Sequence, residues 1–150
     1  MRSVTKRKRT PRAVLDSNIL SRFLLTPRGF SARLLEIIEA GGFVLVTCEA
    51  ILAEVTNVLA RPHVQRYGPF PQNEIVEAVD ALRGVADVVP GRFEVFAVAD
   101  DPKDNPVLAC ALEGHADFVV TDDRKHLRPL KHYHGIQIVS APLFLRVLRG

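Results

Sequence analysis

The sequence predicts an α/β fold built on a parallel sheet, and three observations point to it. Short apolar runs rich in β-branched residues alternate with longer stretches of helical spacing along the 150 residues. The short runs are almost continuously apolar, which is typical of strands covered on both faces. The stretches between them can hold the helical crossovers that parallel strands require. We therefore expect a central parallel sheet of about five strands with helices on both faces.

Followed in order, the chain contains five predicted strands and six predicted helices. The strands are expected at residues 13–15, 43–46, 85–89, 118–120 and 136–139. The helices are expected at residues 17–25, 31–39, 48–60, 73–82, 106–113 and 141–148. Residues that end helices follow four of them, namely Gly41-Gly42, Pro62, Gly84 and Gly114, and Ser140 can cap the last. Residues 62–71, which contain three prolines, are predicted to be a long loop between two helices.

The chain has the length of one domain, and its charge is unevenly distributed. The formal net charge is +3, but residues 1–12 carry six basic side chains and no acidic one. The remaining residues hold fourteen basic side chains against all 17 acidic ones. We interpret residues 1–12 as a basic, disordered arm and residues 13–150 as one mildly acidic domain.

The composition also argues against several classes of protein. No apolar run approaches the roughly 18–20 residues that span a bilayer, and the apolar stretch after the basic start is too short for a signal peptide. We therefore expect a cytoplasmic protein that does not bind a membrane. Cys48 and Cys110 lie among apolar neighbours, which favours two reduced, packed thiols over a disulfide.

Acidic residues follow the predicted strands at one edge of the sheet. Asp16 directly follows the first strand, Asp122 and Asp123 follow the fourth, and Asp104 lies just before the helix that leads into the fourth. The C-terminal ends of parallel strands meet at one edge, where active sites of such sheets lie. Glu54 falls about 40° from the apolar stripe of its own helix, so it can reach over the same edge.

Several carboxylates converging on one spot would repel each other unless a cation shares the site. Sites made only of oxygen ligands select Mg²⁺ or Mn²⁺ over zinc, which prefers His and Cys. The substrate that suits such a centre is a phosphate ester, attacked by a water molecule without a protein nucleophile. The acidic residues therefore predict a divalent-metal site for phosphate ester hydrolysis.

Each of these residues also has a purely structural interpretation, which stays open. The alternatives are a helix N-cap for Asp16 and for Asn105, a solvated helix position for Glu54, and a turn for Asp122 and Asp123, only one of which need point inward. The joint pattern favours a site more strongly than any member does alone.

Four motifs in this order resemble those of the PIN-domain family. They are Val14–Ile19, Ile51–Val55 with Glu54 inside it, Asp101–Ala111 and Ala116–Asp123. The resemblance runs from about Ala13 to the C-terminus and is closest to the bacterial and archaeal branch of toxins from toxin–antitoxin systems. It implies a three-layer α/β/α sandwich and a metal-dependent endoribonuclease. It also implies a homodimer and a small antitoxin protein as a partner.

The resemblance assigns roles to individual residues. The catalytic acids of the family fall on Asp16, Glu54, Asp104 and Asp123, and we expect the metal ligands to be Asp16, Asp104, Asp123 and Asp122. Asn18, Thr121 and Asn105 are the supporting polar residues. The sequence departs from the family pattern at two positions. Asp122 stands where relatives often have Gly, which leaves the choice between Asp122 and Asp123 open, and Asn105 stands where some relatives have another Asp.

Basic side chains near this edge and in the arm are candidates for contact with RNA phosphates. They are Lys6, Arg7, Lys8 and Arg9 in the arm and Arg124 and Lys125 after the last acidic residues. A solubilising tail and a solvated helix face explain the same residues.

The sequence thus favours a Mg²⁺- or Mn²⁺-dependent endoribonuclease. One alternative is a PIN-like scaffold that binds RNA or protein without cleavage. Another is an aspartyl phosphatase or phosphotransfer domain. Asn18 argues against it, because the phosphatase form has an Asp two residues after the position of Asp16.

Overall fold

The computed structural model of the protein describes residues 9–25, 36–66, 71–95, 105–123 and 127–149, and it contains one six-stranded sheet. The strands follow the spatial order β3-β2-β1-β4-β6-β5. Their bounds are β1 Arg12–Leu15, β2 Val44–Thr47, β3 Asp87–Val88, β4 Phe118–Val120, β5 His132–Tyr133 and β6 Ile136–Val139. All pairs are parallel except β5 with β6. The predicted five-stranded parallel sheet is confirmed, with one antiparallel strand added at its edge.

The helices are α1 Ser17–Leu25, α3 Glu49–Ala60, α4 Pro62–Gln65, α5 Gln72–Val85, α6 Asn105–Glu113 and α7 Ala141–Arg149, and Arg128–Leu130 form a 3-10 turn. Residues 36–39 are also helical, and the rest of the predicted helix 31–39 lies outside the described residues. One expectation was wrong, because α4 lies inside the segment predicted as a loop. Proline at the first position of this short helix costs no hydrogen bond, since that N–H has no partner in a helix.

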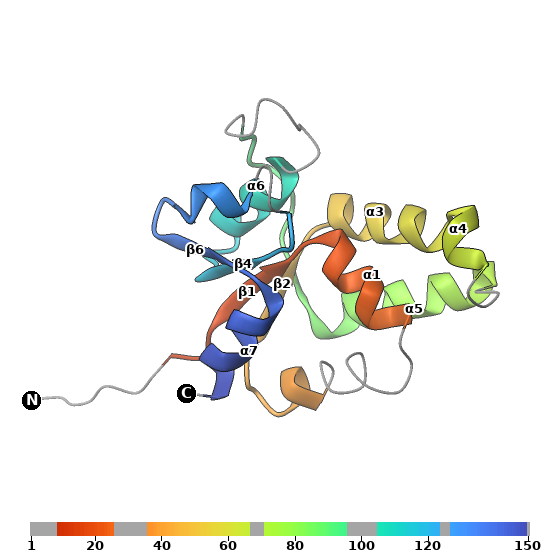
Figure 1. The fold of residues 1–150 in the computed structure, drawn as a ribbon, viewed down its shortest axis with the longest axis horizontal. Helices are drawn as coiled ribbons and strands as arrows, with labels where there is room; N and C mark the ends of the chain where they lie inside the picture. The colour runs from red at the N-terminus through yellow and green to blue at the C-terminus, as the bar shows by residue number, and fades with distance from the viewer. Residues whose placement is uncertain (1–8, 26–35, 67–70, 96–104, 124–126, 150) are drawn as a thin grey trace, which may run out of the picture.

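The sheet is the middle layer of a three-layer sandwich (Figure 1). The packing of Gly114, at the end of α6, against the side chain of Val46 places α6 on one face. On the other face, the Phe144 ring of α7 lies 5.1 Å from the Phe43 ring and 5.6 Å from the Phe118 ring. Helices α1, α3, α4 and α5 form a group on the side of the sheet where β1 ends and α1 begins (Figure 1).

The central strands are buried on both faces, as their continuous apolar runs predict. Ala13, Val14 and Leu15 of β1 are at most 1% exposed, and Leu45 and Val46 of β2 are fully buried. Burial of a side chain of this size contributes about 1.5–3 kcal/mol. The sheet therefore forms a rigid base for the residues that follow its strands.

The first described residues are fixed at the opposite, N-terminal edge of the sheet. Arg12 begins β1, so the strand starts inside the segment that we interpreted as an arm. Its guanidinium donates to the Gly114 carbonyl at 2.9 Å and to Asp87 at 2.6 Å. Arg9 pairs with Asp117, whose carboxylate also accepts the N–H of Arg12 at 2.9 Å.

Within the described residues, no helix has both the length and the apolar character needed to cross a bilayer.

Candidate functional site

The candidate site lies at the edge of the sheet where β1 and β4 end. Asp16 is the first residue after β1, and its N–H still donates to the carbonyl of Val120 at 3.1 Å. Thr121 is the first residue after β4, and its N–H donates to the carbonyl of Val139 in β6 at 2.9 Å. The two residues therefore continue the ladder of the sheet, and their side chains meet on neighbouring strands.

The Asp16 carboxylate is buried and has a hydrogen-bond donor at each oxygen. It is only 6% exposed. Its Oδ1 accepts the N–H of Ile19 at 2.8 Å, as in a helix N-cap, and its Oδ2 accepts the hydroxyl of Thr121. The N-cap interpretation of Asp16 is thus confirmed, and this hydrogen bond leaves the role of Asp16 in a site as a prediction.

Thr121 connects Asp16 to the two acidic residues that follow β4. Its side chain is fully buried. The hydroxyl donates to Asp16 and accepts the backbone N–H of Asp123 at 3.0 Å. A single buried hydroxyl thus fixes both the orientation of the Asp16 carboxylate and the start of the turn that carries Asp122 and Asp123.

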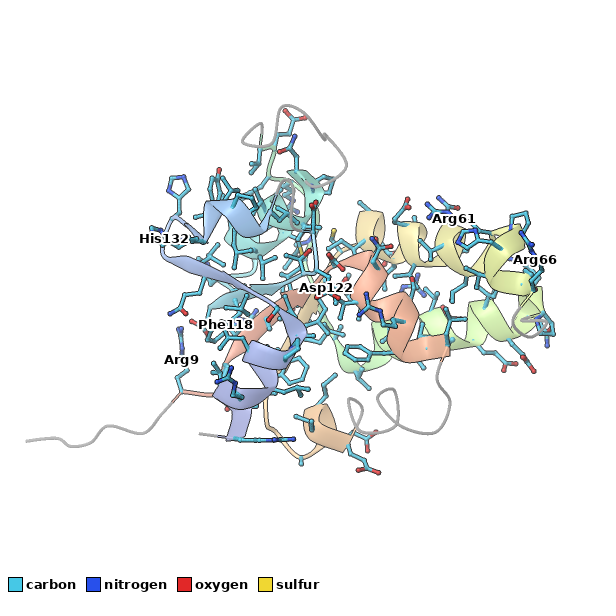
Figure 2. The ribbon with its side chains drawn as sticks, viewed as in Figure 1. Arg9, Arg61, Arg66, Phe118, Asp122 and His132 are labelled. Atoms are coloured by element: carbon cyan, nitrogen blue, oxygen red, sulfur yellow. The ribbon has the colours of Figure 1, made fainter. Side chains whose placement is uncertain are left out.

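The charges of Asp122 and Asp123 act on the carboxylate of Asp16. Burial is the main cause that raises the pKa of Asp16 above its ordinary value, and the negative charges of Asp122 and Asp123 raise it further. The hydrogen bonds from Thr121 and Ile19 act in the opposite direction, because they stabilise the charged form. The carboxylate of Asp122 also forms an ion pair with Arg22 of α1 at 2.7 Å, and Figure 2 shows Asp122 beside that helix.

Glu54 is placed differently from the three aspartates. It lies midway along α3, and its Oε1 accepts from the guanidinium of Arg61 at 3.0 Å. Figure 2 shows Arg61 at the end of α3 that is remote from Asp122. The Glu54 side chain is 36% exposed. Within the described residues, the structure therefore places Asp122 and Asp123 near Asp16, and Glu54 pairs with Arg61.

The supporting polar residues also differ in placement. Thr121 is at the centre of the cluster. Asn18 is exposed in the first turn of α1, and Asn105 begins α6 and is half-buried. Arg9 lies at the opposite edge of the sheet, where it pairs with Asp117 (Figure 2). The remaining candidates lie outside the described residues, namely Asp104, Lys6, Arg7, Lys8, Arg124 and Lys125.

The donors present at this edge fit Mg²⁺ or Mn²⁺. They are carboxylate oxygens with an assisting hydroxyl, which hard divalent cations prefer. Burial and the neighbouring charges of Asp122 and Asp123 make the ionised form of Asp16 unfavourable by itself, and a divalent cation would offset both effects. Within the described part of the chain, no group of three or more acidic, His or Cys side chains is arranged to hold a metal ion.

Two features of this region could not be expected from the sequence motifs. Arg22 pairs with Asp122, and the signal that could have indicated it is its position four residues after Asn18, on the same face of α1. Cys48 and Cys110, which the sequence places far apart, are both buried and line the same pocket. The spacing of the two cysteines carries no signal of this arrangement.

Known proteins resemble the chain in both sequence and fold. An uncharacterized protein of Methanocaldococcus jannaschii, MJ1680, is 26% identical over 113 residues, which cover 75% of this chain and 71% of that protein. The fold is similar to a chain in the crystal structure of VapBC2 from Rickettsia felis bound to a DNA fragment from their promoter. That match has a TM-score of 0.56 and 11% identity and covers 86% of this chain and 98% of the other. A PIN-domain family model matches residues 12–125, a span that contains the whole carboxylate cluster. The chain therefore belongs to the PIN-domain family.

Proposed function

We propose that the protein is a Mg²⁺- or Mn²⁺-dependent endoribonuclease and that Asp16 is the central residue of its site. PIN domains are generally nucleases that use divalent metals, and membership of this family does not support the phosphatase alternative. The observation that carries the proposal is the buried Asp16 carboxylate, held by Thr121 and Ile19 beside Asp122 and Asp123.

The residues of the site would have different roles in the reaction. Asp16, Asp122 and Asp123 would hold the cation together with Asp104, and Glu54 would orient the attacking water after exchanging its Arg61 partner. When bound, the cation neutralises the phosphate, activates a water molecule and stabilises the charge that develops during hydrolysis. Thr121 keeps the Asp16 carboxylate in one orientation by donating to Oδ2.

The reaction needs no protein nucleophile. Water attacks the phosphorus atom of an RNA phosphodiester, the bond from phosphorus to the leaving oxygen breaks, and that oxygen takes up a proton. Arg22, which is 62% exposed and already pairs with a carboxylate of the cluster, is suited to contact a neighbouring phosphate. The basic residues Lys6, Arg7, Lys8, Arg9, Arg124 and Lys125 remain proposed RNA contacts.

The test is cleavage of labelled RNA by the purified protein with Mn²⁺, with Mg²⁺ and with EDTA. Asp16→Asn is the informative variant, and Asp80→Asn is its matched control, because Asp80 is an exposed residue of α5 that pairs with Arg83. We expect cleavage by the wild type and by Asp80→Asn that EDTA abolishes, and no cleavage by Asp16→Asn. Cleavage that persists with EDTA or in Asp16→Asn would contradict the proposal. RNA binding without cleavage by the wild type would instead support a scaffold.

We also propose that the protein is the toxin of a toxin–antitoxin pair in the cytoplasm, a homodimer held inactive by a small antitoxin protein. The motif resemblance and the fold similarity to VapBC2 support this partner class. Co-expression with the product of a neighbouring short gene should yield a stable complex that does not cleave RNA. A complex that cleaves as fast as the free protein would contradict the role of the partner.

A further inference from the structure

Two cysteine thiols meet between the sheet and α6. Cys48 lies between β2 and α3, and Cys110 lies in the second turn of α6. Val46 faces α6, and side chains alternate along a strand, so Cys48 points to the same face two residues later. The Cys48 and Cys110 side chains interact directly, and each shifts the pKa of the other. The two sulfur atoms are therefore neighbours, although the residues are far apart in the sequence.

Both thiols line a cavity of about 430 Å³. The other lining residues include Phe93, Glu94, Val95, Asn105, Pro106 and Glu113. Cys48 is 4% exposed and Cys110 is 2% exposed, so the pair lies at the inner wall of this cavity. A molecule as small as a peroxide fits into a cavity of this volume.

The two thiols differ in how readily they ionise. The hydrogen bond from Cys110 is the main cause that lowers the pKa of Cys48, to about 6, and the N–H groups of Ile51 and Ala50 at the start of α3 act in the same direction. Donation to Cys48, followed by burial, raises the pKa of Cys110 well above its ordinary value. Cys48 is thus the thiol of the pair that ionises more readily.

We propose that Cys48 and Cys110 form an oxidation site at which a peroxide converts the two thiols into an intramolecular disulfide. The Cys48 thiolate attacks one peroxide oxygen, the O–O bond breaks, and after proton uptake the products are a sulfenic acid and one water molecule. The Cys110 sulfur then attacks the Cys48 sulfur, its proton leaves with the displaced hydroxide as a second water molecule, and the S–S bond forms. Two thiols are oxidised and one peroxide is reduced to two water molecules.

The disulfide would join two elements that border the candidate metal site. It links the end of β2, the strand next to β1, to α6, which begins at Asn105 directly after Asp104. The new bond closes a loop of about 60 residues, which in the chain-entropy treatment corresponds to a rise of the thermal midpoint of about 10 °C. A thiol pair that is closed by oxidant and opened by reductant is typical of a regulatory site in a reducing compartment.

The test uses the full-length reduced protein and hydrogen peroxide. After a few equivalents of peroxide, free thiols are blocked with N-ethylmaleimide under denaturing conditions, and the intact mass and the tryptic peptides are measured. We expect a monomer that has lost two hydrogen atoms, a peptide containing Cys48 linked to one containing Cys110, a higher thermal midpoint, and full reversal by dithiothreitol. These readouts do not depend on RNA cleavage, so their failure is distinct from failure of the proposed function.

Single variants identify the attacking sulfur. In Cys110→Ala, which removes the resolving thiol, we expect a sulfenic acid on Cys48 that dimedone traps. In Cys48→Ala, trapping on Cys110 should be at least tenfold slower. Both thiols reacting fully with N-ethylmaleimide after peroxide treatment, or a disulfide only between two chains, would overturn the proposal. The wild-type peptide map decides it even if a variant does not fold.

Discussion

Replacement of Thr121 by Val tests the hydroxyl that organises the candidate site. The variant keeps the size of the side chain and removes two hydrogen bonds, one to the buried Asp16 carboxylate and one from the N–H of Asp123. A hydrogen bond to a charged group contributes about 1.5–3 kcal/mol, and a neutral one about 1 kcal/mol. Thr121 is fully buried, so water does not replace the lost groups. We expect the free energy of unfolding to fall by about 3 kcal/mol, and the thermal midpoint by about 10 °C.

The assay is urea unfolding of the metal-free protein at pH 7, with Thr121→Ser as the matched control. Ser keeps the hydroxyl and loses one methyl group, which corresponds to about 1 kcal/mol. The difference between the two variants therefore isolates the hydroxyl. A loss in Thr121→Val no larger than in Thr121→Ser would show that the hydroxyl does not stabilise the carboxylate, and our description of the site would be refuted.

Three further perturbations follow from the same geometry. Because burial raises the pKa of Asp16 in the folded state, the stability linked to its protonated form is present below about pH 4 and is lost as the pH rises through the folded-state pKa. Asp16→Asn cannot ionise, so it should raise the thermal midpoint of the metal-free protein at pH 7. It should also abolish the rise in the thermal midpoint that Mn²⁺ causes in the wild type. A lower midpoint of the metal-free variant at pH 7 would contradict this prediction. Arg22→Ala removes a cation next to the site, so calorimetry should show several-fold tighter Mn²⁺ binding than in the wild type. The variant should lose less than about 1 kcal/mol of stability. Arg146→Ala of α7 is the control, and equal Mn²⁺ affinities of the two variants would contradict the prediction. Gly114→Ala should lower the free energy of unfolding by about 1–3 kcal/mol, because the new methyl group would lie 2.4 Å from Val46 Cγ1. Gly84→Ala, where the added methyl group meets open space, should be neutral or stabilising in the same urea titration. Equal changes in the two variants would contradict the prediction.

The strands could be predicted where burial determines the sequence. The central strands are apolar because both faces are covered, and their ends locate Asp16 and Thr121 without any knowledge of the structure. The edge strand β5 has no such signal. Its two residues lie between Lys131 and His134, which both have positive φ, so a turn rather than an apolar run defines it.

From the sequence, only the acidic residues that follow the strands of the site could be predicted. Parallel pairing brings the ends of β1 and β4 together, which made the meeting of Asp16 with the acids after Thr121 predictable. Ion pairs of exposed side chains are not encoded in this way. The pairs of Glu54 with Arg61 and of Arg22 with Asp122 depend on rotamers and on how the helices pack, and the spacing of Arg22 from Asn18 does not specify Asp122 as its partner.

The central claim is that the acidic residues around Asp16 hold a divalent cation and that the protein hydrolyses RNA at this site. It is tested most directly by the single-turnover rate of RNA cleavage as a function of Mn²⁺ concentration, measured in parallel for the wild type, Asp16→Asn and Asp80→Asn. We expect saturable dependence on Mn²⁺ for the wild type and Asp80→Asn, and a rate at least about a hundredfold lower for Asp16→Asn, since a catalytic cation supplies several kcal/mol. Equal rates for Asp16→Asn and Asp80→Asn, or a wild-type rate independent of Mn²⁺, would contradict the claim.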